Sequence, residues 1–170
     1  SMIFVPPRFA TDAIFESLDA GIDLTIAITE GIPAHDMMRV YTHLKRGNQT
    51  LIGPNCPGII SPGEATVGIM PTDVFTPGRV GIISRSGTLT YQISKEIGDL
   101  GIGQSSVVGI GGDPIVGSSF IDILQRFEDD PDTDLVVMVG EIGGDVEERA
   151  GVFISENMKT PAVGYIAGFQ

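Results

Sequence analysis

The sequence predicts an α/β protein built on parallel sheets. Short apolar runs rich in β-branched residues alternate with longer segments that have helical spacing. This alternation is typical of strand–helix–strand units, whose strands lie parallel. The 23 glycines gather mainly after apolar runs, where loops at strand ends are expected. In open parallel sheets, ligands bind beyond the carboxyl ends of the strands.

The first block, residues 1–54, follows the order strand, helix, strand, helix, strand. Strands are predicted at Met2–Val5, Leu24–Ile28 and Leu51–Ile52, and helices at Phe9–Ala20 and Pro33–Lys45. The first helix is expected to end at Gly21, because glycine favours the position after a helix.

Residues 55–79 change in character. They are rich in proline and glycine, yet too apolar for a flexible linker. We expect an ordered crossover between two domains, with a small hairpin in it.

The second block, residues 80–170, repeats the alternation and predicts a doubly wound parallel sheet. Its strands are predicted at Val80–Ser84, Ser106–Ile110, Leu135–Val139 and Ala162–Ile166. Its helices are predicted at Thr88–Leu100, Ser118–Glu128 and Val146–Met158.

Composition excludes several function classes. The net charge is −12, opposite to the basic surface that nucleic acids and anionic membranes attract. No apolar run approaches the ~20 residues of a membrane helix. The single cysteine, Cys56, and the histidines His35 and His43 are too few for a disulfide framework or a Cys/His metal cluster. No metal site is expected. Cys56 is expected to be buried or beside a ligand, and the two histidines are expected to be surface or packing residues.

The loop after the predicted strand Val80–Ser84 has the residues of an anion cradle. Ser86, Gly87 and Thr88 stand where a helix begins, and a helix start offers free N–H groups and a positive dipole end. Phosphate and carboxylate both suit this arrangement. An ordinary helix cap with a glycine bend is the alternative, and Arg85 suits either an anion or a surface ion pair.

Two further loops carry acidic residues after buried strands. Thr29 and Glu30 are placed to bond a ribose or a base edge, with a plain turn as the alternative. Glu141, flanked by glycines, is placed to hold a metal or orient an imidazole, again with a turn as the alternative. The acidic run Asp145–Glu148 is expected to be a solvated helix start.

Taken together, the motifs resemble those of one family. The segments ITEGIP, LIGPNCPG, GIISRSGTLTY, VGIGGDP, SFIDIL and VGEIGG occur in order along the chain. The set is similar to the α subunits of succinyl-CoA synthetases, the ADP- or GDP-forming succinate–CoA ligases. The resemblance implies part of a Rossmann-like CoA-binding domain over residues 1–54. It implies a flavodoxin-like CoA-ligase domain, incomplete at its end, over residues 80–170.

The resemblance also implies a mechanism and partners. ATP or GTP, held with Mg in an ATP-grasp β subunit, phosphorylates a histidine of the α subunit. Succinate takes the phosphoryl group, and the thiol of CoA then displaces phosphate to give succinyl-CoA. A bacterial cytoplasmic enzyme of the tricarboxylic acid cycle is implied, with the mitochondrial matrix as an alternative.

Residue roles follow from the matched motifs. The resemblance places CoA at Ile28, Thr29, Glu30 and Cys56. It places substrate and phosphate at Asn55, Ser86, Gly87, Thr88 and Tyr91. It gives Glu141 the role of orienting the phosphorylated histidine.

Two family features are missing from the 170 residues. The family has a glycine-rich loop for the CoA phosphates ahead of the first strand, and a G-H-A-G-A histidine motif after a segment like YIAGFQ. Neither His35 nor His43 stands in such a motif, so a chain of these residues alone is expected to be inactive. Three alternatives remain: another NDP-forming acyl-CoA synthetase or citrate-cleaving relative, a non-catalytic CoA- or anion-binding module, and an FMN-binding flavodoxin-like protein.

Overall fold

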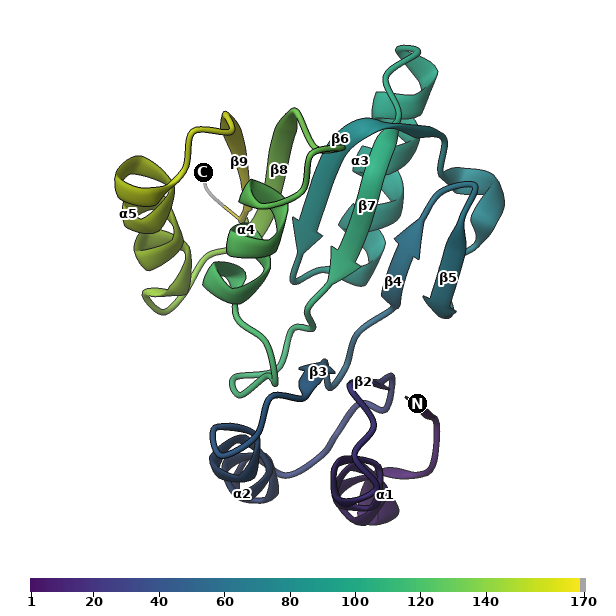
Figure 1. The fold of residues 1–170 in the computed structure, drawn as a ribbon, viewed down its shortest axis with the longest axis vertical. Helices are drawn as coiled ribbons and strands as arrows, with labels where there is room; N and C mark the ends of the chain where they lie inside the picture. The colour runs from purple at the N-terminus through teal and green to yellow at the C-terminus, as the bar shows by residue number, and fades with distance from the viewer. Residues whose placement is uncertain (169–170) are drawn as a thin grey trace.

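The computed structural model describes residues 1–168, which form a three-stranded and a six-stranded sheet (Figure 1). Residues 169 and 170, the end of the YIAGFQ segment, lie outside the described residues. Figure 1 shows the smaller sheet below the larger one, with two strands of the larger sheet, β6 (Pro77–Ser84) and β7 (Gln104–Gly109), pointing toward it.

The smaller sheet confirms the predicted order of the first block. Its parallel strands are β1 (Met2–Ile3), β2 (Leu24–Ala27) and β3 (Thr50–Ile52). The helices α1 (Pro7–Asp19) and α2 (Ala34–Leu44) pack against it through a shared apolar cluster. Helix α1 begins earlier than predicted, because proline at the first helical position gives up an N–H that would have no partner.

The crossover region contributes strands to the larger sheet. Strands β4 (Gly58–Ser61) and β5 (Ala65–Gly68) form the expected hairpin. Strand β4 then pairs antiparallel with β7 (Gln104–Gly109), so the larger sheet is not purely parallel as predicted. Gly58 allows the close approach of β4 to β5 in the hairpin, since a Cβ there would lie 2.2 Å from the carbonyl oxygen of Val67 in β5.

The rest of the larger sheet confirms the doubly wound α/β class. A short 3₁₀ helix, η1 (Thr72–Val74), leads into β6 (Pro77–Ser84), and the sheet ends with β8 (Leu135–Glu141) and β9 (Ala162–Ala167). The strand order is β5-β4-β7-β6-β8-β9, with β7, β6, β8 and β9 parallel. Helix α3 (Gly87–Asp99) packs on one face, and α4 (Phe120–Glu128) and α5 (Val146–Asn157) on the other.

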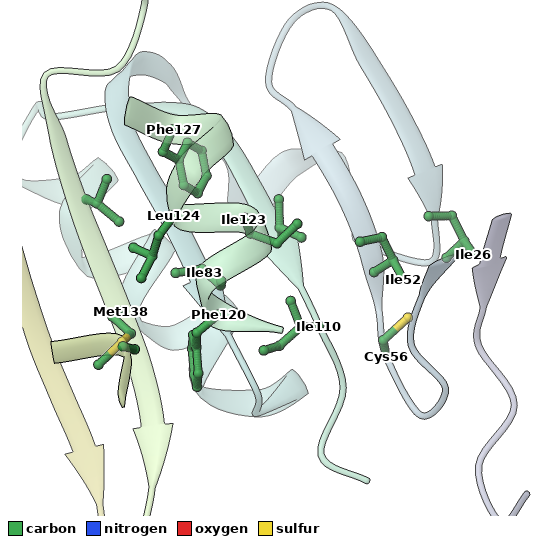
Figure 2. Close-up of a cluster of buried hydrophobic side chains, with 13 residues drawn as sticks. Ile26, Ile52, Cys56, Ile83, Ile110, Phe120, Ile123, Leu124, Phe127 and Met138 are labelled. Atoms are coloured by element: carbon green, nitrogen blue, oxygen red, sulfur yellow. The ribbon is translucent and has the colours of Figure 1, made fainter. Parts of the chain in front are cut away.

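One hydrophobic cluster joins the two sheets. It contains Ile26 and Ile52 of the smaller sheet together with Ile83 of β6 and Leu124 of α4 (Figure 2). At Gly81 a Cβ would lie 2.7 Å from the Phe127 ring, so this glycine lets α4 pack closely on β6. The packing fixes the loop after β2 against the carboxyl ends of the larger sheet.

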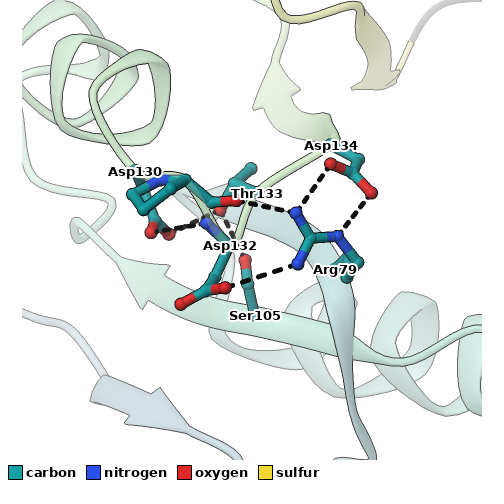
Figure 3. Close-up of polar contacts among 7 residues, drawn as sticks. Arg79, Ser105, Asp130, Asp132, Thr133 and Asp134 are labelled. Atoms are coloured by element: carbon teal, nitrogen blue, oxygen red, sulfur yellow. Dashed lines mark hydrogen bonds and ion pairs between the residues drawn. The ribbon is translucent and has the colours of Figure 1, made fainter.

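The opposite, amino end of the larger sheet is closed by an arginine (Figure 3). Arg79 of β6 donates from Nε to Asp134 Oδ2 at 2.5 Å and from Nη1 to Asp132 Oδ1 at 3.3 Å. It also donates to the Pro131 carbonyl at 2.7 Å. The guanidinium lowers the pKa of the Asp134 carboxyl. These contacts hold the loop before β8 against β6.

Candidate functional site

A pocket of about 480 Å³ lies where loops from both sheets meet. It is lined by residues that follow β2, β3, β6, β7 and β8. Eight of the ten predicted site residues line it: Ile28, Glu30, Asn55, Cys56, Ser86, Gly87, Tyr91 and Glu141. The structure therefore brings together segments far apart in the sequence.

The other two predicted residues are neighbours of the pocket but do not line it. The Thr29 hydroxyl donates to the Val5 carbonyl at 2.8 Å, which ties the loop after β2 to the chain after β1. The Thr88 side chain is exposed in the first turn of α3.

The start of α3 offers backbone donors to the pocket. Ser86 caps the helix, its hydroxyl accepting from the Leu89 N–H at 3.4 Å. Its own N–H donates to the Ser84 hydroxyl at 3.1 Å. Within residues 1–168 the N–H groups of Gly87 and Thr88 have no partner. A Cβ on Gly87 would meet nothing within 4 Å, so the space beside this helix start is open. Free N–H groups at the positive end of a helix suit an anion.

Asn55 connects three loops at the base of the pocket. Its N–H donates to the Thr29 carbonyl at 3.0 Å, and its Nδ2 donates to Asp113 Oδ1 at 2.9 Å. Its carbonyl accepts from the Gly112 N–H at 3.4 Å. The backbone of Asn55 has a φ of 54°, a left-handed conformation that asparagine tolerates better than most side chains. The pocket thus has a floor shared by both sheets.

Cys56 is buried and Tyr91 is partly buried, and both stay protonated at neutral pH. The Cys56 thiol donates to the Ala27 carbonyl at 3.3 Å, and burial raises its pKa to about 12. At neutral pH it is a thiol and not a nucleophilic thiolate, which agrees with the expectation of a packed cysteine. Tyr91 packs edge-on against Phe75, and burial also raises the pKa of its phenol.

A partly buried ion pair lies at the pocket wall. Arg85 donates from Nη1 to Glu147 Oε1 at 2.9 Å, and the Glu141 N–H donates to the same oxygen at 3.1 Å. The Glu147 side chain is only 12% exposed, so the expectation that Asp145–Glu148 is fully solvated is wrong for this residue. Gly140 leaves room for it, since a Cβ there would lie 2.5 Å from Glu147 Cγ.

No sequence motif identifies Glu147. An acidic residue in the first turn of a helix is common, because it interacts well with the helix dipole. The signal that could have found it is the glycine before Glu141, which leaves space at the end of a buried strand.

The second half of the chain matches a known protein family. A family model described as CoA-ligase matches residues 83–170, more than half of the chain. The chain belongs to the CoA-ligase family. The matched region contains the start of α3, Arg85, Tyr91, Glu141 and Glu147.

Relatives of this CoA-ligase chain are named as α subunits. It is 60% identical over 168 residues to the succinate–CoA ligase [ADP-forming] subunit alpha 2 of Archaeoglobus fulgidus. It is 54% identical over 172 residues to the malate–CoA ligase subunit alpha of Methylorubrum extorquens. Each match covers 99% of this chain and 58% of the relative, so the chain spans little more than half their length.

A solved structure has the same fold. It is the ATP citrate lyase from Methanothrix soehngenii in complex with citrate and coenzyme A. It superposes with a TM-score of 0.90 at 25% identity, over 98% of this chain and 29% of that chain.

The histidines of the CoA-ligase chain lie away from the pocket. His43 of α2 packs edge-on against Phe15 and lies 3.4 Å from Asp19 Oδ1. His35 is exposed near the start of α2. Among residues 1–168 no group of three or more His, Cys, Asp or Glu side chains is arranged to hold a metal ion. No helix in this part of the chain is long and apolar enough to cross a membrane.

The charges of the pocket set what this CoA-ligase site can do. Arg85 is the one cationic side chain among the described residues that line the pocket. Glu30 and Glu141 are the two carboxylates among them. An anion at the start of α3 would meet Arg85 and the free N–H groups of Gly87 and Thr88. Glu141, at the end of β8, is left to accept a hydrogen bond or to hold a cationic group.

Proposed function

We propose that the protein acts as the α subunit of a succinate–CoA ligase. The reaction is the reversible conversion of succinate, CoA and ATP or GTP into succinyl-CoA, the nucleoside diphosphate and phosphate. The observation that carries the proposal is the pocket itself. The larger sheet and its loops contribute the start of α3, Arg85 and Glu141 to the pocket lining. The loop after β2 of the smaller sheet contributes Ile28 and Glu30. Relatives named as succinate–CoA ligase α subunits support it.

Each part of the pocket receives a role in the proposal. Ile28, Thr29, Glu30 and Cys56 contact CoA, and Asn55 and Tyr91 contact the acid. Ser86, Gly87 and Thr88 hold the phosphoryl group by backbone and hydroxyl donors. Glu141 orients the phosphorylated histidine. Residues 1–54 then belong to a Rossmann-like CoA-binding domain, and residues 80–170 to a flavodoxin-like ligase domain joined to it by residues 55–79.

The phosphoryl carrier is a histidine other than His35 and His43. Neither lines the pocket, and His43 is engaged with Phe15 and Asp19. The proposed partner is an ATP-grasp β subunit, which holds the nucleotide with Mg. The cytoplasm is the proposed location.

A second acid substrate has a specific observation in its favour. The malate–CoA ligase subunit alpha is 54% identical over 99% of this chain, close to the value for the succinate enzymes. Malate is succinate with one added hydroxyl, and an apolar wall alone rejects such an addition weakly.

A chimera tests the proposal. Residues 1–170 replace the matching segment of the Archaeoglobus α subunit, and the product is combined with that enzyme's β subunit. We expect CoA- and nucleotide-dependent formation of succinyl-CoA, faster with succinate than with malate or citrate. We also expect its loss in Glu141→Gln. A well-folded chimera that binds the β subunit but forms no acyl-CoA contradicts the proposal.

A companion measurement uses a polypeptide of the 170 residues alone. With the β subunit and γ-labelled ATP we expect no phosphohistidine on it. Labelling of His35 or His43 would contradict the assignment of the carrier.

A further inference from the structure

One carboxylate oxygen connects two loops of the pocket. Oε1 of Glu147 accepts from Arg85 Nη1 at 2.9 Å and from the Glu141 N–H at 3.1 Å. Arg85 follows β6, Glu141 ends β8, and Glu147 is in the first turn of α5. The three residues come from separate elements, and the contact is made at the wall of the pocket.

The arrangement is shielded from water. The side chains of Arg85 and Glu147 are 17% and 12% exposed, whereas the neighbouring Glu148 is exposed. A charge removed from water in this way is tolerated only when it is paired and hydrogen-bonded. Gly140 leaves the space that brings Glu147 under the strand end. The contact therefore depends on local geometry and is not a chance surface pair.

The contact leaves most of the arginine free. A guanidinium has five N–H donors, and within residues 1–168 the Arg85 side chain uses one of its nitrogens, Nη1, toward Glu147. Arg85 lines a pocket that is also lined by Ser86 and Gly87 at the start of α3. A planar guanidinium held at one nitrogen can present the other two to a phosphate or carboxylate.

We propose that Glu147 is a positioning residue for an anion in this pocket. It aims Arg85 at the anion and fixes the loop that carries Glu141, without itself lining the pocket. The inference deepens the proposed function and rests on it for the identity of the anion, a phosphoryl group or the carboxylate of the acid substrate.

The test compares two matched substitutions, Glu147→Asp and Glu148→Asp. Both substitutions shorten a carboxylate side chain by one methylene in the same turn of α5. Within residues 1–168, Glu147 accepts from Arg85 and Glu148 does not. The protein is titrated with inorganic phosphate and, separately, with CoA by calorimetry. For Glu147→Asp we expect phosphate affinity to fall about tenfold and CoA affinity to change less than about twofold. For Glu148→Asp we expect neither to change.

A charge exchange keeps the inference testable where Glu147→Asp does not fold. The double variant Arg85→Glu, Glu147→Arg rebuilds the pair in reverse. We expect it to recover thermal stability relative to Arg85→Glu alone, but not phosphate binding. A purely structural pair would recover both.

The outcomes separate the two proposals. The inference is overturned if Glu147→Asp keeps wild-type phosphate affinity, if it weakens phosphate and CoA equally, or if the exchanged pair binds phosphate. Wild-type protein that binds CoA but no phosphate also overturns the inference, and leaves the proposed function standing. An inactive chimera together with the expected phosphate pattern supports Glu147 and rejects the proposed function.

Discussion

Two arginines at opposite ends of β6 are used in opposite ways. Arg79, near the amino end, has a 50% exposed side chain and bonds Asp132, Asp134 and the Pro131 carbonyl. Arg85, just past the carboxyl end, is 17% exposed and bonds Glu147. All three guanidinium nitrogens of Arg79 donate to protein groups, whereas Arg85 uses one nitrogen within residues 1–168. The arginine at the amino end of β6 is thus engaged in holding a loop, and the arginine past the carboxyl end keeps donors for the proposed anion.

The largest expected effect comes from removing each arginine in turn. Arg85→Met should weaken phosphate binding by at least about thirtyfold, because the cation of the pocket is lost. Arg79→Met should leave phosphate affinity unchanged and lower the melting temperature, because the loop before β8 loses its anchor. Calorimetric titration and thermal unfolding measure the two quantities. Equal effects of the two substitutions on phosphate binding would remove the distinction between the two ends.

Two glycines sharpen the comparison, Gly81 within β6 and Gly87 at the start of the helix that follows it. Gly81→Ala should cost about 2 kcal/mol of unfolding free energy, because the new methyl group meets the Phe127 ring. Gly87→Ala should keep or slightly raise stability, since its methyl group enters open space and the unfolded chain loses freedom. Its phosphate affinity should nevertheless fall, because the methyl group stands at the pocket wall. Urea unfolding with phosphate titration checks both. A Gly87→Ala protein that binds phosphate normally would argue against an anion at the start of α3.

A third expectation concerns Cys56, between the ligand-binding end and the core. Burial raises the pKa of this thiol to about 12, because the thiolate is poorly solvated there. The folded state therefore holds this proton more tightly than the unfolded state. Its contribution to stability is complete below pH 9 and is lost as the pH rises toward the folded pKa. We expect a loss of about 1 kcal/mol between pH 8 and pH 10.

The control for this expectation is Cys56→Ala. Lysines and tyrosines titrate in the same range, so the informative quantity is the difference between the two pH profiles of unfolding free energy. Identical slopes would show that the thiol is better solvated than its burial indicates.

The smallest expected effect lies on α3, away from the ligand-binding end. Within residues 1–168 the buried Ser94 hydroxyl has no hydrogen-bond partner, although the Ser94 carbonyl accepts from Gln104 Nε2. Ser94→Ala should raise the free energy of unfolding by about 0.5 kcal/mol, because an unsatisfied polar group is removed from the core. Chemical denaturation with matched m-values measures this. A clear loss of stability would mean that the hydroxyl has a partner, such as a buried water.

Local patterns were sufficient to predict most elements. Among residues 1–168, the apolar pattern located the α-helices and the parallel strands to within a few residues, but it missed the short 3₁₀ helix η1. The pairing of β4 with β7 was not predictable, since nothing local in Gly58–Ser61 indicates which strand lies beside it. Eight of the predicted site residues converge because loops at the carboxyl ends of parallel strands share one edge.

Glu147 escaped prediction for a different reason. Its role depends on burial and on a shared oxygen atom, and neither is encoded in the spacing of residue types. Asp145 and Glu148 beside it have the same acidic character and are exposed. Only the three-dimensional path of the chain distinguishes them.

The hydrophobic cluster shared by the two sheets also limits how the molecule can move. Ile26 and Ile52 of the smaller sheet lie in the same buried cluster as Ile83 and Val108 of the larger one. A hinge between the sheets would expose these side chains to water at a cost of roughly 2 kcal/mol for each. The cavity between the loops is therefore built on a rigid frame. We therefore expect the two sheets to keep their relative position when a ligand binds, and any adjustment to be confined to the loops between them.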